Sequence, residues 1–267
     1  MLLLIAIILG VVEGLTEFLP ISSTGHLILV GNLLGAERHL GREATQAFEI
    51  FIQLGAILAV VVAYPGRFRD LLNLRCRSGF SGLRAIGLLA VTSIPAGLAG
   101  LLAHKHIHAW LFNPVAVAAA LGVGALWILL VEHRLPHTAI DDLDALSWRK
   151  ALAVGLFQTL ALWPGMSRST ATILGGMLSG LNRGVAAEYS FLSAVPLLGA
   201  AACYSLYASW DALGAEHVIP FAVGFAVSFV AALLAIRAFV GFLRRHNLTP
   251  FAWYRLVLAG LVLWLWL

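Results

Sequence analysis

Two glutamates near the start of the chain, Glu13 and Glu17, lie four residues apart in an otherwise apolar stretch. On a helix this spacing points both carboxylates to one face. Inside a membrane each charge would cost about 2.5–3.5 kcal/mol, and the two would repel unless a cation lies between them or one stays protonated. Such oxygen ligands suit a hard divalent cation, Mg²⁺ or Ca²⁺. The alternative is a helix end at the membrane surface with both carboxylates hydrated.

A hydroxyl and an imidazole follow shortly afterwards, at Ser23 and His26. They are neighbours on a helix that begins at Ser22 or Ser23. The pair could be a nucleophile with its base, or a phosphate-binding cap with a general acid. In the alternative reading Ser22, Ser23 and Thr24 only cap the helix, and His26 satisfies a hydrogen bond.

A third polar group follows a Pro-Gly pair much later in the chain: Ser167, Arg168, Ser169 and Thr172. The N-terminus of a helix binds anions, and a guanidinium adds a fork of donors suited to phosphate oxygens. An arginine at mid-membrane needs an anionic partner, which Glu13 or Glu17 could supply. A purely structural pair of Arg168 with one of these acids is therefore the alternative, and it is compatible with phosphate binding.

A further polar stripe, Gln46, Glu49 and Gln53, recurs at helical spacing. It could line a cavity. Hydrogen bonding between helices is the role we favour from the sequence.

The composition decides where these groups must lie. Of 267 residues, 61% are hydrophobic and only 11% are Asp, Glu, Lys or Arg, with a mean hydropathy of +0.93. A soluble domain carries roughly a quarter charged residues, so soluble and disordered classes are excluded. The net charge of +4 is carried by arginines in short loops between apolar runs, which excludes nucleic acid as a partner.

Apolar runs of about 20 residues predict membrane-spanning helices, and their continuity excludes a β-barrel. Two further apolar stretches, 1–35 and 148–181, are broken in the middle by proline, glycine and hydroxyl residues. We expect each to form a re-entrant helix–loop–helix hairpin. The six predicted spans are 44–64, 82–103, 113–132, 184–207, 218–242 and 250–267.

The two breaks resemble each other, because aligning Pro20 with Pro164 brings Ser23 onto Ser167. Each half then holds one hairpin and three spans, so the halves have opposite orientations. We predict an all-α polytopic membrane protein, one membrane domain of inverted-topology repeats with a site between them. The first repeat covers about 1–132 and the second about 148–267.

Loop charges are consistent with this topology. With the loop after 44–64 in the cytoplasm, only Arg38, Arg42 and Lys105 fall on the outer side. The remaining loop arginines and lysines, with Arg255 among them, fall on the cytoplasmic side, as the positive-inside rule requires. Both termini are then outside, and Arg168 lies within the second break.

Two segments resemble the signature motifs of a known family. The first runs from Glu13 to His26 as Glu-Gly-Leu-Thr-Glu-Phe-Leu-Pro-Ile-Ser-Ser-Thr-Gly-His, and the second from Pro164 to Thr172 as Pro-Gly-Met-Ser-Arg-Ser-Thr-Ala-Thr. Over essentially the whole chain the sequence resembles the undecaprenyl-diphosphate phosphatase family, also called the bacitracin-resistance family. One departure is Thr170, where glycine is usual.

This resemblance implies a bacterial inner-membrane enzyme that removes the terminal phosphate of undecaprenyl diphosphate, recycles the lipid carrier of cell-wall synthesis and gives bacitracin resistance. It also implies a divalent metal and a site that opens toward the periplasm. Besides the polyprenyl diphosphate, membrane lipids are expected partners, and a homodimer is compatible with the sequence. The implied roles are catalysis by Glu17, Ser23, His26 and Arg168, metal binding by Glu13 and Glu17, and phosphate binding by Arg168, Thr24, Ser167, Ser169 and Thr172.

The sequence leaves open which group is the nucleophile and whether the protein is an enzyme or a transporter. Ser23 is our choice of nucleophile, with His26 as its base and then as acid. A water activated by His26 or by a glutamate is the alternative. Inverted repeats with broken helices are also typical of transporters, so a secondary transporter or flippase of an anionic lipid is the rival function.

Overall fold

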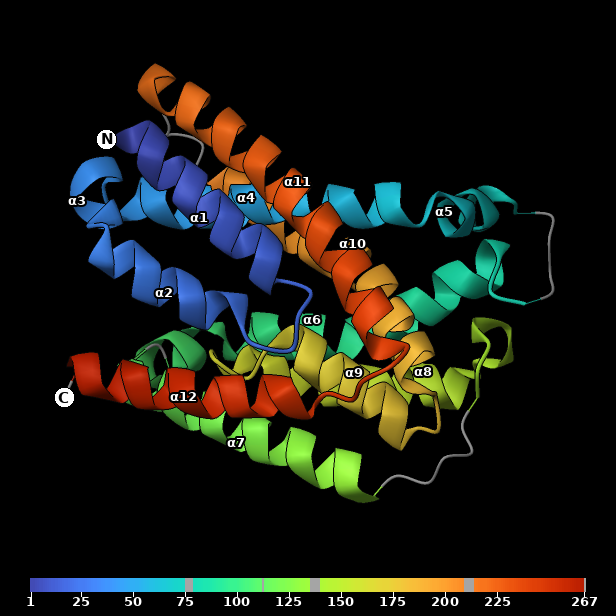
Figure 1. The fold of residues 1–267 in the computed structure, drawn as a ribbon. Helices are drawn as coiled ribbons and strands as arrows, with labels where there is room; N and C mark the ends of the chain where they lie inside the picture. The colour runs from blue at the N-terminus through green and yellow to red at the C-terminus, as the bar shows by residue number, and fades with distance from the viewer. Residues whose placement is uncertain (75–78, 112, 135–139, 209–213, 267) are drawn as a thin grey trace.

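The computed structural model describes residues 1–267 except 75–78, 112, 135–139, 209–213 and 267, and the described part is almost entirely helical (Figure 1). The side chain of Lys105, which the topology places outside, is not among the described parts. The helices are α1 (Leu2–Thr16), α2 (Ser23–Leu33), α3 (Ala36–Leu40), α4 (Arg42–Ala63), α5 (Pro65–Leu72), α6 (Gly82–Leu111), α7 (Pro114–Arg134), α8 (Trp148–Gln158), α9 (Arg168–Leu178), α10 (Arg183–Ala208), α11 (Val218–Leu243) and α12 (Thr249–Trp266).

Both broken stretches fold as helix–loop–helix, α1 with α2 and α8 with α9. The second helix of each begins at a serine cap with positive φ, 73° at Ser22 and 74° at Ser167. Ser22 Oγ accepts the Gly25 N–H at 3.3 Å, and Ser167 Oγ accepts the Thr170 N–H at 3.2 Å. Two serines held in a backbone conformation that L-residues rarely adopt indicate loops fixed by their surroundings.

The structural equivalence of the two caps differs by one residue from the predicted alignment. Ser22 corresponds to Ser167, whereas the alignment on the prolines paired Ser23 with Ser167. The second loop holds one more residue between its proline and its cap. Its Gly165 has φ +97°, and a Cβ there would lie 2.5 Å from the Val117 carbonyl oxygen. The longer loop thus packs directly on the backbone of α7.

Among the described residues, five helices are long and apolar enough to cross a membrane, rather than the six predicted. The sixth predicted span, 250–267, forms α12, whose apolar part, Thr249–Leu265, is shorter than the others. Residue 267 itself lies outside the described part. The five candidate spans are Arg42–Ala63, Gly82–Ala103, Pro114–Arg134, Arg183–Tyr207 and Ala215–Leu243. The fold is that of a polytopic helical membrane protein.

Each hairpin packs on a long helix from the other half of the chain (Figure 1). Helix α1 lies along α11, and α8 lies along α6. The remaining large contacts join α4 with α10 and with α11, and α7 with α12. The halves are interlocked, so neither hairpin is held by its own half alone.

Glycines permit both of these hairpin contacts. A Cβ on Gly14 of α1 would lie 2.4 Å from the Ser228 carbonyl oxygen of α11. A Cβ on Gly155 of α8 would lie 2.6 Å from the Thr92 carbonyl oxygen of α6. Real side-chain carbons do not approach this closely, so each pair of helices packs backbone against backbone.

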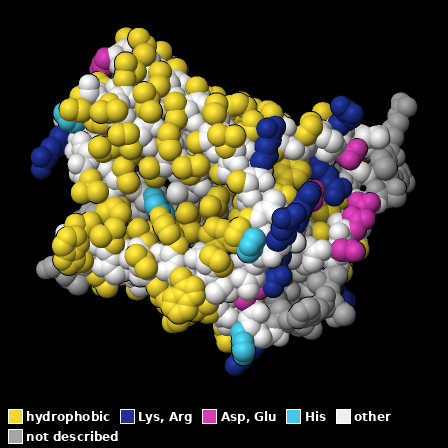
Figure 2. All heavy atoms as spheres, viewed as in Figure 1, with side chains coloured by type: hydrophobic (Ala, Val, Ile, Leu, Met, Phe, Trp, Pro, Cys, Tyr) yellow, Lys and Arg dark blue, Asp and Glu magenta, His cyan; other side chains and the backbone are white. Residues whose placement is uncertain are grey.

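The outer surface carries many large apolar side chains, and Figure 2 shows them covering most of one face. Lysine and arginine gather toward the end of that face where α5 lies (Figures 1 and 2). A face this apolar suits a lipid surrounding rather than water. The most exposed apolar residues include Leu72, Leu101, Leu102, Trp110, Tyr207, Val257 and Trp264.

Candidate functional site

The tips of the two hairpins meet around one ion pair. Arg168, at the start of α9, places Nη2 2.9 Å from Glu17 Oε1, just after the end of α1. The Nη1 atom of Arg168 donates to the Ser190 carbonyl oxygen at 3.0 Å and to its hydroxyl at 3.2 Å. Both charged side chains are buried, with 9% and 5% of their surface exposed. Glu17 near the start of the chain and the distant Arg168 therefore meet.

One donor of this arginine has no partner. The Nε atom of Arg168 is buried and makes no hydrogen bond within the part of the chain that the structure describes. A buried unsatisfied N–H on a charged group costs free energy, and such groups in native structures call for an explanation. An anionic oxygen at this point would satisfy it, while Nη2 keeps Glu17 paired.

Ser23 also binds Glu17. Its hydroxyl donates to Glu17 Oε2 at 2.6 Å, so the two carboxylate oxygens accept one bond from the arginine and one from the serine. Sequence spacing predicted His26 as the partner of Ser23. The structure places a carboxylate there instead, because the loop after α1 turns Glu17 toward the start of α2.

His26 is engaged elsewhere through both ring nitrogens. Nδ1 lies 2.7 Å from the Ser22 carbonyl oxygen, and Nε2 lies 2.6 Å from the Tyr254 hydroxyl of α12. A carbonyl only accepts, so Nδ1 carries a proton and Nε2 of the neutral ring accepts from Tyr254. The rings of His26 and Tyr254 also stack, 5.6 Å between centroids. Sequence reasoning missed Tyr254, whose only signal was a hydroxyl next to Arg255 on an apolar helix.

The hydroxyls of the second motif fasten the loops. Ser169 Oγ donates to the Leu19 carbonyl oxygen of the first loop at 2.7 Å and lies 2.9 Å from Ser167 Oγ. Thr172 Oγ1 lies 2.6 Å from Ser190 Oγ, the group that also receives Arg168. These contacts set the position of the arginine.

Arg255 is the largest correction to the topology predicted from the sequence. It was assigned to the cytoplasmic surface, yet it is completely buried, because α12 begins at Thr249 and carries it inward. Its guanidinium donates to carbonyl oxygens from both loops and from α7, and to the hydroxyl of Thr170. The carbonyl acceptors belong to Pro20, Ala120, Leu121, Gly165 and Met166. Arg255 therefore holds the two hairpin tips together.

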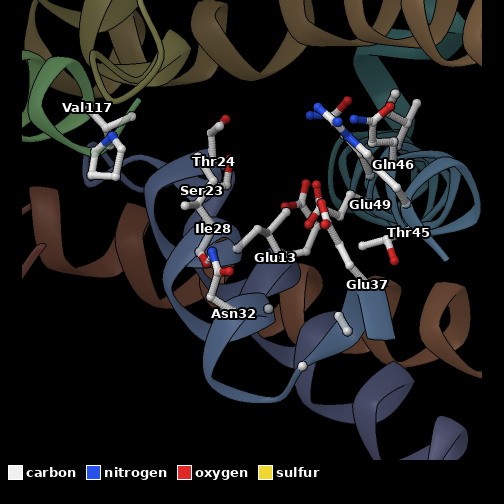
Figure 3. Close-up of a pocket in the computed structure, with 18 of the residues that line it drawn as sticks. Glu13, Ser23, Thr24, Ile28, Asn32, Glu37, Thr45, Gln46, Glu49 and Val117 are labelled. Atoms are coloured by element: carbon white, nitrogen blue, oxygen red, sulfur yellow. Dashed lines mark hydrogen bonds between the residues drawn. The ribbon is translucent and has the colours of Figure 1, made fainter. Parts of the chain in front are cut away.

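A cavity of about 890 Å³ opens beside this centre (Figure 3). Ser23, Thr24 and Glu13 line it from the first hairpin, and Gln46 and Glu49 from α4. The polar stripe on α4, which the sequence favoured as a contact between helices, faces this cavity. The Oε1 atom of Glu13 is buried and has no hydrogen-bond partner among the described residues.

Together these features define a polytopic membrane protein with a polar, charged site built from two helix–loop–helix hairpins. The family model described as bacitracin resistance protein BacA matches residues 6–261. The chain belongs to this family.

Relatives with curated names cover nearly the whole chain. The undecaprenyl-diphosphatase of Solidesulfovibrio magneticus is 52% identical over 263 residues, 98% of each chain. That of Nitratidesulfovibrio vulgaris is 54% identical over 257 residues, 96% of each chain. Undecaprenyl-diphosphatase 1 of Chromobacterium violaceum is 51% identical over 261 residues, 98% of this chain and 95% of the relative.

Proposed function

We propose that the centre formed by Glu17, Ser23 and Arg168 is the site at which this chain hydrolyses undecaprenyl diphosphate to undecaprenyl phosphate and inorganic phosphate. The chain is an enzyme of the bacitracin-resistance family and a multi-pass membrane protein of bacteria. The observation that carries the assignment is the contact of one carboxylate with both a hydroxyl and a guanidinium. A nucleophile, a base and a phosphate ligand thus lie within one hydrogen-bonded group.

Arg168 is the proposed ligand of the terminal phosphate. Its unpartnered Nε is a donor for a phosphate oxygen, and the start of α9 adds the partial positive charge of a helix N-terminus. Charge spreads over the equatorial oxygens as the phosphoryl group transfers. A donor fixed there in advance stabilises the transition state more than the ground state.

Ser23 is the proposed nucleophile, with Glu17 rather than His26 as its base. The Ser23 oxygen bonds to the terminal phosphorus while the bond from that phosphorus to the bridging oxygen breaks. The serine proton moves to Glu17, and undecaprenyl phosphate leaves with the bridging oxygen. Water then cleaves the phosphoserine, which releases inorganic phosphate and restores the hydroxyl. The 2.6 Å Ser23–Glu17 hydrogen bond supports this order of proton transfer.

A divalent cation, Mg²⁺ or Ca²⁺, is part of the proposal. Glu13 fits this role, because its buried Oε1 lacks a partner and its side chain lines the cavity. Glu17 fits less well, since both of its oxygens already accept hydrogen bonds. A bound cation would neutralise charge on the diphosphate oxygens.

We also propose that the single membrane domain consists of two inverted repeats, about 1–132 and 148–267, with 1–35 and 148–181 as re-entrant hairpins. The exchange of hairpins between the halves supports this, since α1 packs on α11 and α8 on α6. The proposed location is the bacterial inner membrane, with the cavity opening to the periplasm and the isoprenoid chain in lipid.

Trapping the covalent intermediate tests the mechanism. Purified protein in detergent receives undecaprenyl diphosphate labelled with ³²P in the terminal phosphate and is quenched during turnover. We expect release of phosphate without any gradient and label attached to Ser23. Turnover by Ser23→Ala without label would replace the serine by an activated water. No release from the wild type, with Mg²⁺ or Ca²⁺ present, would favour the transporter.

A further inference from the structure

Glu13 is a buried carboxylate, and one of its oxygen atoms lacks a hydrogen-bond donor in the described structure. Only 1% of the residue is exposed, and its Oε1 has no donor within reach in the described structure. Burial of a charged carboxylate without a compensating partner is unfavourable. The side chain lies at the wall of the 890 Å³ cavity and is directed into it (Figure 3). A cationic ligand in the cavity would remove this cost.

Glu17, the neighbouring acid, is not free to share that ligand. Arg168 occupies its Oε1 at 2.9 Å and Ser23 its Oε2 at 2.6 Å. Breaking the buried pair with Arg168 would leave a guanidinium uncompensated, which is strongly destabilising. The second carboxylate for a cation at Glu13 must therefore come from elsewhere.

Besides Glu13, the cavity is lined by the carboxylates of Glu37 and Glu49. Glu37 is exposed, whereas Glu49 of α4 is half-buried, so Glu49 is the carboxylate that we assign to the cation. The carboxylates of Glu13 and Glu49 point toward one another from opposite walls of the cavity (Figure 3). Glu49 Oε1 lies beside α2, since a Cβ at Gly31 would be in ordinary contact with it at 3.8 Å. The amides of Gln46 and Gln53 line the same cavity and add neutral oxygen donors.

We propose that Glu13 and Glu49, rather than Glu13 and Glu17, bind the divalent cation that the diphosphate requires. The proposal rests on the phosphatase assignment above. Among the described residues, no three His, Cys, Asp or Glu side chains are grouped closely enough to hold a metal by themselves. A site with only two carboxylates is consistent with this, because Mg²⁺ is usually held by one or two carboxylates together with water and substrate phosphates.

This arrangement separates two tasks within the site. Glu17 keeps Ser23 and Arg168 in place, while Glu13 and Glu49 position the cation on the cavity side. The polar stripe on α4 then belongs to the active site. Glu49 should consequently affect metal binding without removing the proposed nucleophile or its base.

Mn²⁺ titration followed by electron paramagnetic resonance tests the assignment without turnover. Metal-free protein in detergent is titrated in the presence of methylene diphosphonate, with Glu13→Gln, Glu49→Gln, Glu17→Gln and the control Glu43→Gln. Glu43 is exposed on the first turn of the same helix and does not line the cavity. We expect Glu13→Gln and Glu49→Gln to raise the apparent Kd at least about 10-fold, and Glu43→Gln to leave it unchanged.

The Glu17→Gln variant decides whether the cation is bound by Glu13 and Glu49 or by Glu13 and Glu17. We expect it to change the Mn²⁺ affinity less than about 3-fold, since its carboxylate is not a ligand here. Loss of affinity in Glu17→Gln with wild-type affinity in Glu49→Gln would overturn the proposal. If Glu49→Gln does not yield a monodisperse protein, Glu49→Asp replaces it, and unchanged affinity there with loss in Glu17→Asp would equally refute it. Glu49-dependent Mn²⁺ binding without phosphate release would instead refute the phosphatase site alone.

Discussion

The two hairpins share a backbone design and differ in charge. In each, a serine with φ near +73° caps the second helix, and a glycine in the first helix packs against the backbone of a long helix from the other half. The first hairpin carries Glu13 and Glu17, whereas the second carries Arg168. One hairpin thus supplies carboxylate oxygens and the other supplies donors. A diphosphate with its cation needs both kinds of group, which explains why the tips must meet.

Comparing the two hairpins also separates the contacts that stabilise the fold from the groups that we propose bind the diphosphate and the cation. Contacts common to both tips are structural: the serine caps, the glycines and the carbonyls that Arg255 collects from the two loops. Among the described residues, the charged groups with an unpartnered buried atom are Glu13 (Oε1) in the first hairpin and Arg168 (Nε) in the second; Oε1 of the neutral Gln158 in the second hairpin is also unpartnered. The two hairpins therefore differ in the sign of the charge that is left without a full set of partners.

Arg168→Lys should produce the largest effect on activity. Lysine keeps a positive charge beside Glu17 but loses the planar fork and the free Nε donor. We expect kcat to fall roughly 10²–10³-fold, the usual effect of removing one transition-state donor, while the folded yield is retained. Phosphate release under substrate saturation measures it.

Arg149→Lys is the matched control, because Arg149 is exposed on α8 of the same hairpin. It should behave as wild type. Equal activity of Arg168→Lys and the control would remove the proposed division of charge between the hairpins.

Replacing the glycine at each hairpin contact by alanine should have a smaller effect, on stability, and of similar size for both hairpins. Gly14→Ala and Gly155→Ala each force a methyl group onto a carbonyl oxygen, at 2.4 and 2.6 Å. We expect each to lower the free energy of unfolding by about 1–3 kcal/mol, as overpacking does. Thermal unfolding in detergent compares them with Gly260→Ala, where a Cβ meets nothing within 4 Å. A loss at only one glycine would show that the hairpins are not held in the same way.

The sequence predicted much of this arrangement because the informative residues are polar residues and prolines that interrupt long apolar segments. Acidic residues, prolines and hydroxyl residues inside apolar runs located both helix breaks. The free-energy cost of a charged side chain in the membrane predicted that Arg168 pairs with an acidic residue. In the described part of the chain, five of the six predicted spans have the length and apolarity of spans, and the sixth forms the apolar helix α12, Thr249–Trp266.

Contacts between distant segments could not be read from spacing. The Ser23–His26 neighbourhood suggested a catalytic pair, but the hydrogen bonds are Ser23–Glu17 and His26–Tyr254. Those partners depend on how the loop after α1 turns and on how α12 packs. Arg255 was misplaced for a related reason, since loop counting assumes that charges near helix ends reach water.

Photoaffinity labelling tests most directly whether the two tips form one diphosphate site. A prenyl diphosphate analogue with a diazirine on the isoprene next to the diphosphate is cross-linked to purified protein, and the labelled peptides are sequenced. We predict label in both 17–26 and 163–172, with undecaprenyl diphosphate preventing it. Label confined to one tip, or placed on other segments while competition still succeeds, would contradict a shared site.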